Sequence, residues 1–86
     1  MRAAMRAAHQ LEAALEAVFA DVLQVPAEAL TDGFSPDDCP QWDSLQHINL
    51  VVAIEERFRI RLEPEDVAEM LNFGLVKMIV ADRLER

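Results

Sequence analysis

Apolar residues recur at helical spacing near the start of the chain, and this pattern most constrains the fold. Between residues 7 and 25 they lie on one side of a projected helix and acids lie on the other: Leu11, Leu15, Val18, Phe19, Val22 and Leu23 against Glu12, Glu16 and Asp21. A pattern of this kind is typical of an amphipathic helix that buries one face. Pro26 then ends the helix or begins a short turn.

Apolar residues recur at the same helical spacing in two later long segments and in one short segment between them. We expect a second helix from Ser44 to Phe58, a short third helix that begins at Pro64, and a fourth helix capped by Asn72. The expected buried positions are Val67, Met70 and Leu71 in the third helix, and one side of the fourth formed by Val76, Ile79, Val80 and Leu84. The alternating stretch "FRIRL" has no second strand to pair with. The sequence therefore predicts an all-α bundle of four helices.

The segment from Pro26 to Asp43 reads as a long loop between the first and second helices. It holds three of the four prolines, one of the two glycines and five acids, which are loop signals. Loops of this length in compact domains are usually functional or partly ordered. We expect one helical turn in "PAEAL", and we expect Phe34 and Trp42 to hold the loop against the bundle.

Size and charge exclude several classes of function. A chain of 86 residues predicts one small domain, residues 1–86, with little room for a deep active site. The net charge of −8 argues against nucleic-acid binding. It is equally consistent with partners that have basic surfaces and with the solubility that an excess of acids gives to a small domain. Cys39 is the sole cysteine, so no internal disulfide is expected. No apolar run approaches the ~18 residues of a membrane span and no secretory signal is evident, so a cytoplasmic protein is expected.

Ser44 occupies a chemically distinctive position. Asp43 is a favoured N-cap residue, so Ser44 is expected to be the first residue of the second helix, exposed at the positive end of the helix dipole. A phosphate group on its hydroxyl would find backbone N–H donors there. The alternative is that Ser44 only helps to cap the helix.

The second helix is apolar on two sides. At ~100° per residue, Leu50, Val51, Ile54 and Phe58 form the natural core face, whereas Leu45, Ile48 and Val52 form a second stripe. A small bundle cannot easily bury both, so the second stripe is expected to be exposed. Asp43, Glu55 and Glu56 flank it. An apolar stripe edged by acids suits docking to partners with basic, apolar grooves.

No catalytic or metal-binding residues are predicted. His9 and His47 are not placed by the sequence to activate Ser44, and a serine without a base is not a nucleophile. Asp37, Asp38 and Cys39 lack the spacing of a metal site. Cys39 is interpreted as an unreactive loop thiol, because neighbouring acids disfavour its thiolate. A small hydrolase that uses Ser44 is therefore disfavoured.

"DSL" followed by "INLVVAIEERFRIRLEPEDV" closely resembles the second helix and its continuation in acyl carrier proteins, and the resemblance extends over nearly the whole chain. It implies that a Mg²⁺-dependent phosphopantetheinyl transferase esterifies Ser44 with 4'-phosphopantetheine from coenzyme A. The arm would carry acyl groups as thioesters to acyl-activating or acyl-transferring enzymes. The chain itself would be a monomeric carrier and not an enzyme. The resemblance also assigns Asp43 to the motif, and Leu45, Ile48, Val52, Glu55 and Glu56 to partner docking.

The chain departs from the carriers of fatty-acid synthesis in its charge pattern. Gln46 and Asn49 stand where acids are expected, and "ERFRIR" adds Arg57, Arg59 and Arg61. Trp42 before the motif is similar to stand-alone carriers of specialised pathways. We therefore expect a specialised acyl carrier, with an aminoacyl or D-alanyl carrier and an unmodified helical adaptor as alternatives.

Overall fold

Four α-helices and two short 3₁₀ turns make up the regular structure of the described part of the chain. The computed structural model describes residues 2–85, with side chains described for residues 10–85. The order is α1 (Arg2–Leu23), η1 (Ala27–Ala29), η2 (Pro36–Asp38), α2 (Ser44–Phe58), α3 (Pro64–Ala68) and α4 (Phe73–Leu84). No strand occurs in residues 2–85. The predicted all-α bundle with a long first loop and a short third helix is confirmed.

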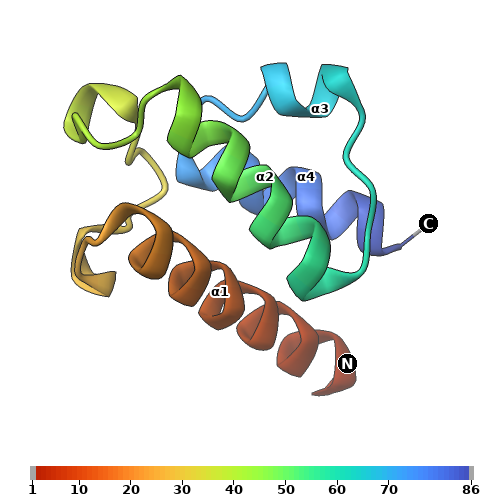
Figure 1. Ribbon diagram of the computed structural model, residues 1–86. Coiled ribbons are helices and arrows are strands. Elements are labelled where there is room, and N and C mark those ends of the chain that lie inside the picture. Colours follow the sequence, from red (N-terminus) through yellow and green to blue (C-terminus); the bar gives the residue numbers. More distant parts are fainter. Residues whose placement is uncertain (1, 86) are drawn as a thin grey trace.

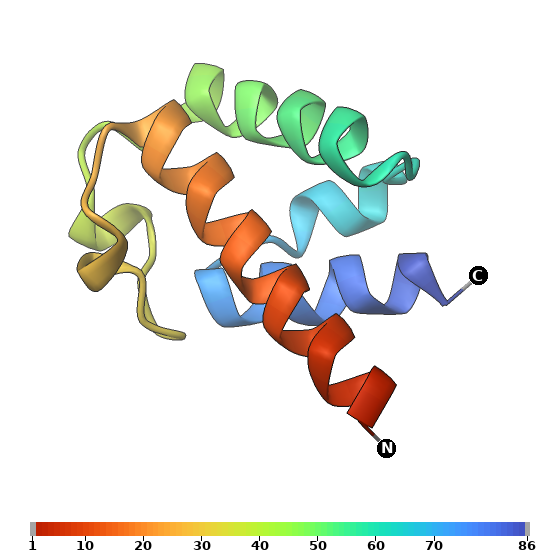
Figure 2. The same cartoon turned by 90° about the horizontal axis from the view of Figure 1, so that it is seen from below.

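The three longer helices pack together, and the short α3 lies beside α2 and α4 (Figures 1 and 2). The loop between α1 and α2 lies at one end of the bundle, where α2 begins. The end of α2 lies at the other end of the bundle, together with the first turns of α1 and the last turn of α4 (Figure 1). The start and the end of α2 therefore face different surroundings.

The core lies between α1, α2 and α4 and extends under the loop. Phe19 of α1 is at its centre, with edge-to-face ring contacts to Trp42 at 5.3 Å and to Phe73 at 5.0 Å. Such aromatic pairs add to the burial energy of the rings. The buried cluster comprises Leu15, Phe19, Leu23, Leu30, Phe34, Cys39, Trp42, Leu50, Ile54, Leu62, Met70, Phe73, Val76 and Val80.

The long loop is ordered by aromatic anchors and by hydrogen bonds to α4. Phe34 and Trp42 are buried and their rings stack at 5.9 Å, which confirms their expected role. The Phe34 carbonyl accepts a hydrogen bond from the Phe73 amide at 2.8 Å, and the Asp32 carbonyl accepts one from the Gly74 amide at 2.8 Å. The loop thus satisfies amides at the start of α4 that have no acceptor within the helix. A Cβ on Gly74 would lie 3.0 Å from the Asp32 carbonyl oxygen, so the close approach favours glycine.

Each helix boundary has a local cause. Asn72 caps α4 by accepting a hydrogen bond from the Leu75 amide at 2.8 Å, as predicted. Helix α1 ends where Gln24 adopts a left-handed conformation, with φ of 58°. The Gln24 side-chain amide donates to the Asp21 carbonyl at 2.6 Å, which satisfies one of the last carbonyls of α1. Pro26 then precedes η1, so "PAEAL" forms the expected turn.

The prediction for the third helix is wrong in two respects. Helix α3 ends at Ala68, whereas the sequence predicts a helix over residues 64–71 ("PEDVAEML"), because the chain must turn to reach the Asn72 cap of α4. Leu71 therefore lies outside the helix and is 63% exposed, whereas Met70 is buried. Val67 is only half-buried. In α4, Leu84 is exposed at the last helical position. The side chain of His9 lies outside the described side chains.

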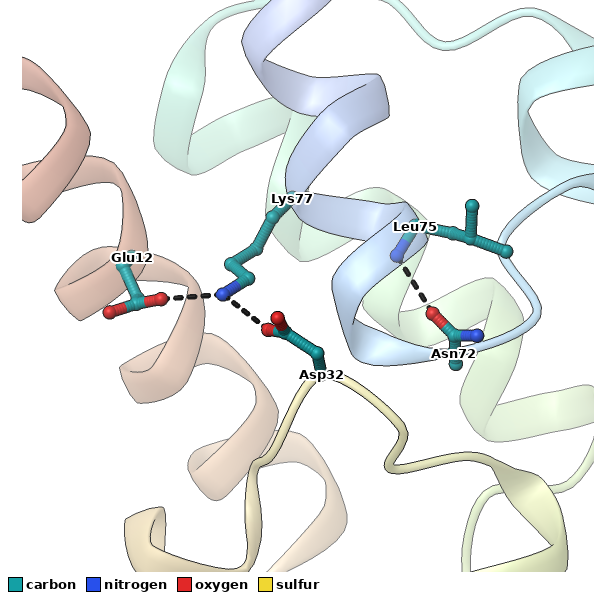
Figure 3. A network of polar contacts seen from close by, with 5 residues as sticks. All are labelled: Glu12, Asp32, Asn72, Leu75 and Lys77. Atoms are coloured by element: carbon teal, nitrogen blue, oxygen red, sulfur yellow. Dashed lines mark hydrogen bonds and ion pairs between the residues drawn. The ribbon is translucent and has the colours of Figure 1, made fainter.

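Lys77 of α4 joins three segments of the chain (Figure 3). Its ammonium group lies 2.5 Å from a Glu12 carboxylate oxygen on α1 and 2.6 Å from an Asp32 carboxylate oxygen in the loop. The hydrogen bond to Asp32, followed by that to Glu12, raises the pKa of Lys77 above its ordinary value of 10.5. The folded state therefore favours protonated Lys77.

Lys77→Met is expected to lower the free energy of unfolding by about 1 kcal/mol at neutral pH, because both acids are partly solvent-exposed and screened. A raised pKa in the folded state means that this contribution is complete below the ordinary lysine pKa and is lost as pH rises above it. Urea denaturation of both proteins from neutral pH to about pH 11 measures the difference. If the two proteins differ in free energy of unfolding by the same amount at high pH as at neutral pH, the effect comes from packing of the aliphatic part of Lys77 and not from its charge.

Candidate functional site

Ser44 is the first residue of α2 and is exposed. Its neighbour Asp43 is the N-cap residue and has extended backbone geometry, and its carboxylate accepts a hydrogen bond from the Gln46 amide at 2.9 Å. The Ser44 and Leu45 amides have no acceptor within α2, because a helix leaves its first N–H groups without intrahelical partners. The hydroxyl thus lies at the positive end of a 15-residue helix, a position that favours a phosphate group.

The second apolar stripe of α2 is exposed, as the sequence predicts. Leu45, Ile48 and Val52 are 67%, 58% and 48% exposed. The opposite side supplies Leu50 and Ile54 to the core, with Val51 and Phe58 packed against it. An apolar stripe therefore runs along α2 from beside Ser44. We refer to Leu45, Ile48 and Val52 as the α2 stripe.

The three acids predicted beside the α2 stripe have different surroundings. Glu56 is exposed. Glu55 is half-buried, and its carboxylate accepts a hydrogen bond from the Leu62 amide at 2.9 Å. Glu55 thus holds the α2–α3 loop, which the sequence did not suggest. Asp43 is exposed but uses one carboxylate oxygen in the cap.

A surface groove with a volume of about 790 Å³ opens beside Ser44. It lies between the start of α2, the η2 turn and α3. Its walls combine apolar and polar side chains, including Trp42, Ile48, Val67, Met70 and Leu71 together with Asp37. The exposure of Leu71, which the sequence did not predict, adds an apolar side chain to this groove.

His47 ties together the segments that surround the groove. Trp42 Nε1 donates a hydrogen bond to His47 Nδ1 at 2.9 Å, and His47 Nε2 lies 3.0 Å from the Val67 carbonyl oxygen. An indole N–H only donates, so Nδ1 must accept, and Nε2 carries the proton and donates to Val67. The Trp42 and His47 rings also stack at 6.1 Å. The pair links the loop, α2 and α3 within one helical turn of Ser44.

Two other polar residues of the loop, Cys39 and Ser35, form hydrogen bonds within the loop. Cys39 is buried, and its thiol donates to the Gln41 side-chain oxygen at 3.4 Å. Ser35 begins η2 and accepts a hydrogen bond from the Asp37 amide at 3.2 Å. Among residues 2–85, no three histidine, cysteine or acidic side chains gather in a way that could hold a metal ion.

Sequence reasoning located Ser44, its cap and the α2 stripe, but it missed the His47 link and the second role of Glu55. Both depend on contacts between residues distant in the sequence, since His47 reaches Val67 and Glu55 reaches Leu62. The one available signal was Trp42, a buried indole that needs an acceptor for its N–H. His47, five residues later on the first turns of α2, is that acceptor.

Comparisons with known proteins agree with this architecture. No protein-family model matches the chain, and no match was found among curated protein sequences. Among solved structures, the chain resembles the solution NMR structure of holo acyl carrier protein from Geobacter metallireducens, with a TM-score of 0.79 and 31% sequence identity. The match covers 87% of this chain and 86% of that one.

Fold and sequence similarity over most of both chains define the class as a small helical carrier domain. The chain belongs to the acyl carrier protein family. Membership supports an acyl carrier role. Within the described residues, no helix has both the length and the apolar character needed to cross a membrane.

Proposed function

We propose that residues 1–86 form one carrier domain that bears 4'-phosphopantetheine on Ser44 and presents thioester-linked acyl groups to biosynthetic enzymes in the cytoplasm. The main support is the exposed Ser44 hydroxyl at the start of α2, next to an exposed apolar stripe, in a member of the acyl carrier protein family. The similar Geobacter protein was solved in its holo form. The chain would act as a monomeric substrate of other enzymes and not as a catalyst.

The residues around Ser44 fit a phosphopantetheine group. The phosphodiester would lie at the positive end of α2, near amides that have no acceptor within the helix. The groove beside Ser44 offers apolar walls next to the attachment point. When bound, the group would supply a terminal thiol for acyl transfer. Tethering keeps that thiol at a high local concentration near any enzyme that binds α2.

In the proposed complexes, the α2 stripe contacts apolar residues of the partner enzyme. Asp43, Glu55 and Glu56 then face basic residues of that enzyme. Of Glu55 and Glu56, Glu56 is the more accessible to a partner, because the Glu55 carboxylate already accepts a hydrogen bond from the Leu62 amide. Gln46 and Asn49 are neutral and bonded to each other through their side chains at 2.8 Å. This charge pattern supports a specialised pathway in place of general fatty-acid synthesis.

Two other functions remain as alternatives. An aminoacyl or D-alanyl carrier would use Ser44 in the same way but carry a different group. An unmodified helical adaptor would use the α2 stripe alone. Incubation of the purified apo protein with coenzyme A, Mg²⁺ and a broad-specificity transferase, followed by intact mass measurement, separates both kinds of carrier from the adaptor. Our proposal predicts a gain of one phosphopantetheine per chain. A protein that folds but gains no mass would favour the adaptor.

Ile48→Asp is expected to reduce the kcat/KM of phosphopantetheine loading by about tenfold or more, because it places a charge in the middle of an apolar contact. The fold should be unaffected, since Ile48 is 58% exposed. Met78→Asp on α4 is the matched control: Met78 is 68% exposed and belongs to a different helix from the α2 stripe. Equal losses from both variants would show that overall charge, and not the α2 stripe, controls loading.

A further inference from the structure

Three arginines at the end of α2 have no ionic partner within the described residues. Arg57 lies in the last turn of α2, Arg59 is its C-cap residue, and Arg61 follows in the loop to α3. All three side chains are exposed. The other cations with described side chains, Lys77 and Arg83, both form ion pairs with acids. The three arginines are therefore unneutralised cations close together in the sequence of a chain of net charge −8, between Glu55 and Glu56 before them and Glu63 after them.

Arg59 occupies a backbone conformation that favours glycine. Its φ of 56° and ψ of 47° are left-handed, and this conformation strains a residue that has a side chain. Gln24 has a similar conformation at the end of α1, but its side chain donates to the Asp21 carbonyl. Arg59 makes no such side-chain hydrogen bond among the described residues. The Arg59 and Ile60 amides both donate to the Glu55 carbonyl, so the backbone forms a left-handed helix cap in which the Arg59 side chain takes no part.

A mostly apolar groove of about 600 Å³ has Arg57 as one of its lining residues. It lies between α1, the end of α2 and the last turn of α4, and its walls include Leu11, Ala14, Ala17, Phe58 and Leu84 as well as Arg57. The Arg57 guanidinium lies 5.8 Å from the centre of the Phe58 ring. This end of the bundle is opposite the end at which α2 begins (Figure 1), so the groove is separate from the one beside Ser44.

We propose that Arg57, Arg59, Arg61 and this groove form a second docking surface, which binds an acidic segment of a partner protein that inserts an apolar side chain. Guanidinium groups bind carboxylates through paired hydrogen bonds, and the groove supplies the adjacent apolar contact. The net charge of −8 repels every acidic partner at long range, but it repels an extended polyanion such as DNA or an anionic membrane more than a short segment with few acids. The proposal goes beyond the carrier function, because Ser44 takes no part in this surface.

The probe is a short synthetic helical peptide with leucines and glutamates next to one another on the same face. We expect it to shift the amide NMR signals of Arg57, Arg59, Arg61 and the groove residues, and to bind more weakly above ~0.15 M salt. The Arg57→Gln, Arg59→Gln, Arg61→Gln triple variant should lose at least tenfold in affinity. The corresponding triple lysine variant keeps the positive charges but not the paired N–H donors. Its affinity for the peptide should lie between those of the parent chain and the triple glutamine variant.

Arg59→Gly tests whether weaker peptide binding comes from loss of the arginine side chain or from unfolding of the protein. It should weaken peptide binding and raise the Tm by about 2–6 °C, because glycine relieves the left-handed strain at a smaller cost in backbone entropy. The proposal is overturned if the peptide leaves these signals unchanged or shifts only the α2 stripe. It is equally overturned if phosphatidylglycerol vesicles or duplex DNA bind the arginines and the peptide does not. Intact-mass loading of the triple glutamine variant should equal that of the parent chain, so the carrier function is judged independently.

Discussion

Ser44→Ala is expected to abolish phosphopantetheine loading completely, because the proposed modification forms a bond to the Ser44 hydroxyl oxygen and the variant lacks that oxygen. Apo protein, coenzyme A, Mg²⁺ and a broad-specificity transferase are incubated together, and the intact mass is followed with time. The variant should fold normally, since Ser44 is exposed and Asp43 supplies the cap through its bond to the Gln46 amide. The adduct should be undetectable.

Ser35→Ala is the matched control, since Ser35 and Ser44 are the two serines of the chain. Ser35 also begins a helical turn, but η2 is only three residues long and has little dipole. Its hydroxyl already interacts with the Asp37 amide and the Asp38 carboxylate. Loading of Ser35→Ala should match that of the parent chain. Loss of loading in Ser35→Ala with retention in Ser44→Ala would place the modification in the loop and contradict the account.

Trp42→Ala is expected to lower the free energy of unfolding by about 3–5 kcal/mol. The ring is buried against Phe19 and Phe34, and its N–H donates to His47. Deletion would leave a cavity beneath the loop and remove the donor to Nδ1. Small domains have total stabilities of about 5–15 kcal/mol, so this loss is a large share of the total and should lower the Tm strongly. Urea denaturation followed by circular dichroism measures this, because the chain has no second tryptophan for fluorescence.

Trp42→Phe distinguishes the packing of the ring from its hydrogen bond. Phenylalanine keeps most of the apolar contact with Phe19 but cannot donate to His47. We expect a smaller loss of about 1–2 kcal/mol, typical of one buried hydrogen bond. The hydrogen-exchange rates of the α3 amides should rise in this variant. His47 loses its hydrogen bond from Trp42, which orients the ring for its bond to the Val67 carbonyl. A loss as large as that of Trp42→Ala would mean that the hydrogen bond dominates.

The helices were predictable because each depends mainly on local sequence. Ser44–Phe58 has the expected bounds because Asp43 is a strong N-cap residue and the apolar period is regular. The exposure of Leu45, Ile48 and Val52 also followed from that period, since the core face of α2 was already assigned to Leu50 and Ile54. Phe34 and Trp42 were recognisable as loop anchors because large aromatic side chains are rarely left exposed in a polar loop.

The remaining features depend on distant contacts that one sequence does not encode in a readable way. Leu71 was assigned to the core because the helical period was continued past Ala68, where the chain in fact turns toward α4. Lys77 is paired with Glu12 and Asp32, which lie on two other segments. The roles of His47 and Glu55 likewise require α2, α3 and the connecting loops to be in place. Charge composition showed an excess of acids but not that three arginines would lack partners.

Mass spectrometry of the protein purified from its growing natural host, with thioesters kept intact, tests the central claim most directly. Fragmentation of the peptide that contains Ser44 should show phosphopantetheine on that residue, with an acyl group on the terminal thiol in part of the population. The mass of the acyl group would also distinguish an aminoacyl carrier from an acyl carrier. A Ser44 that is unmodified in all of the purified protein, or an arm attached to another residue, would contradict the account.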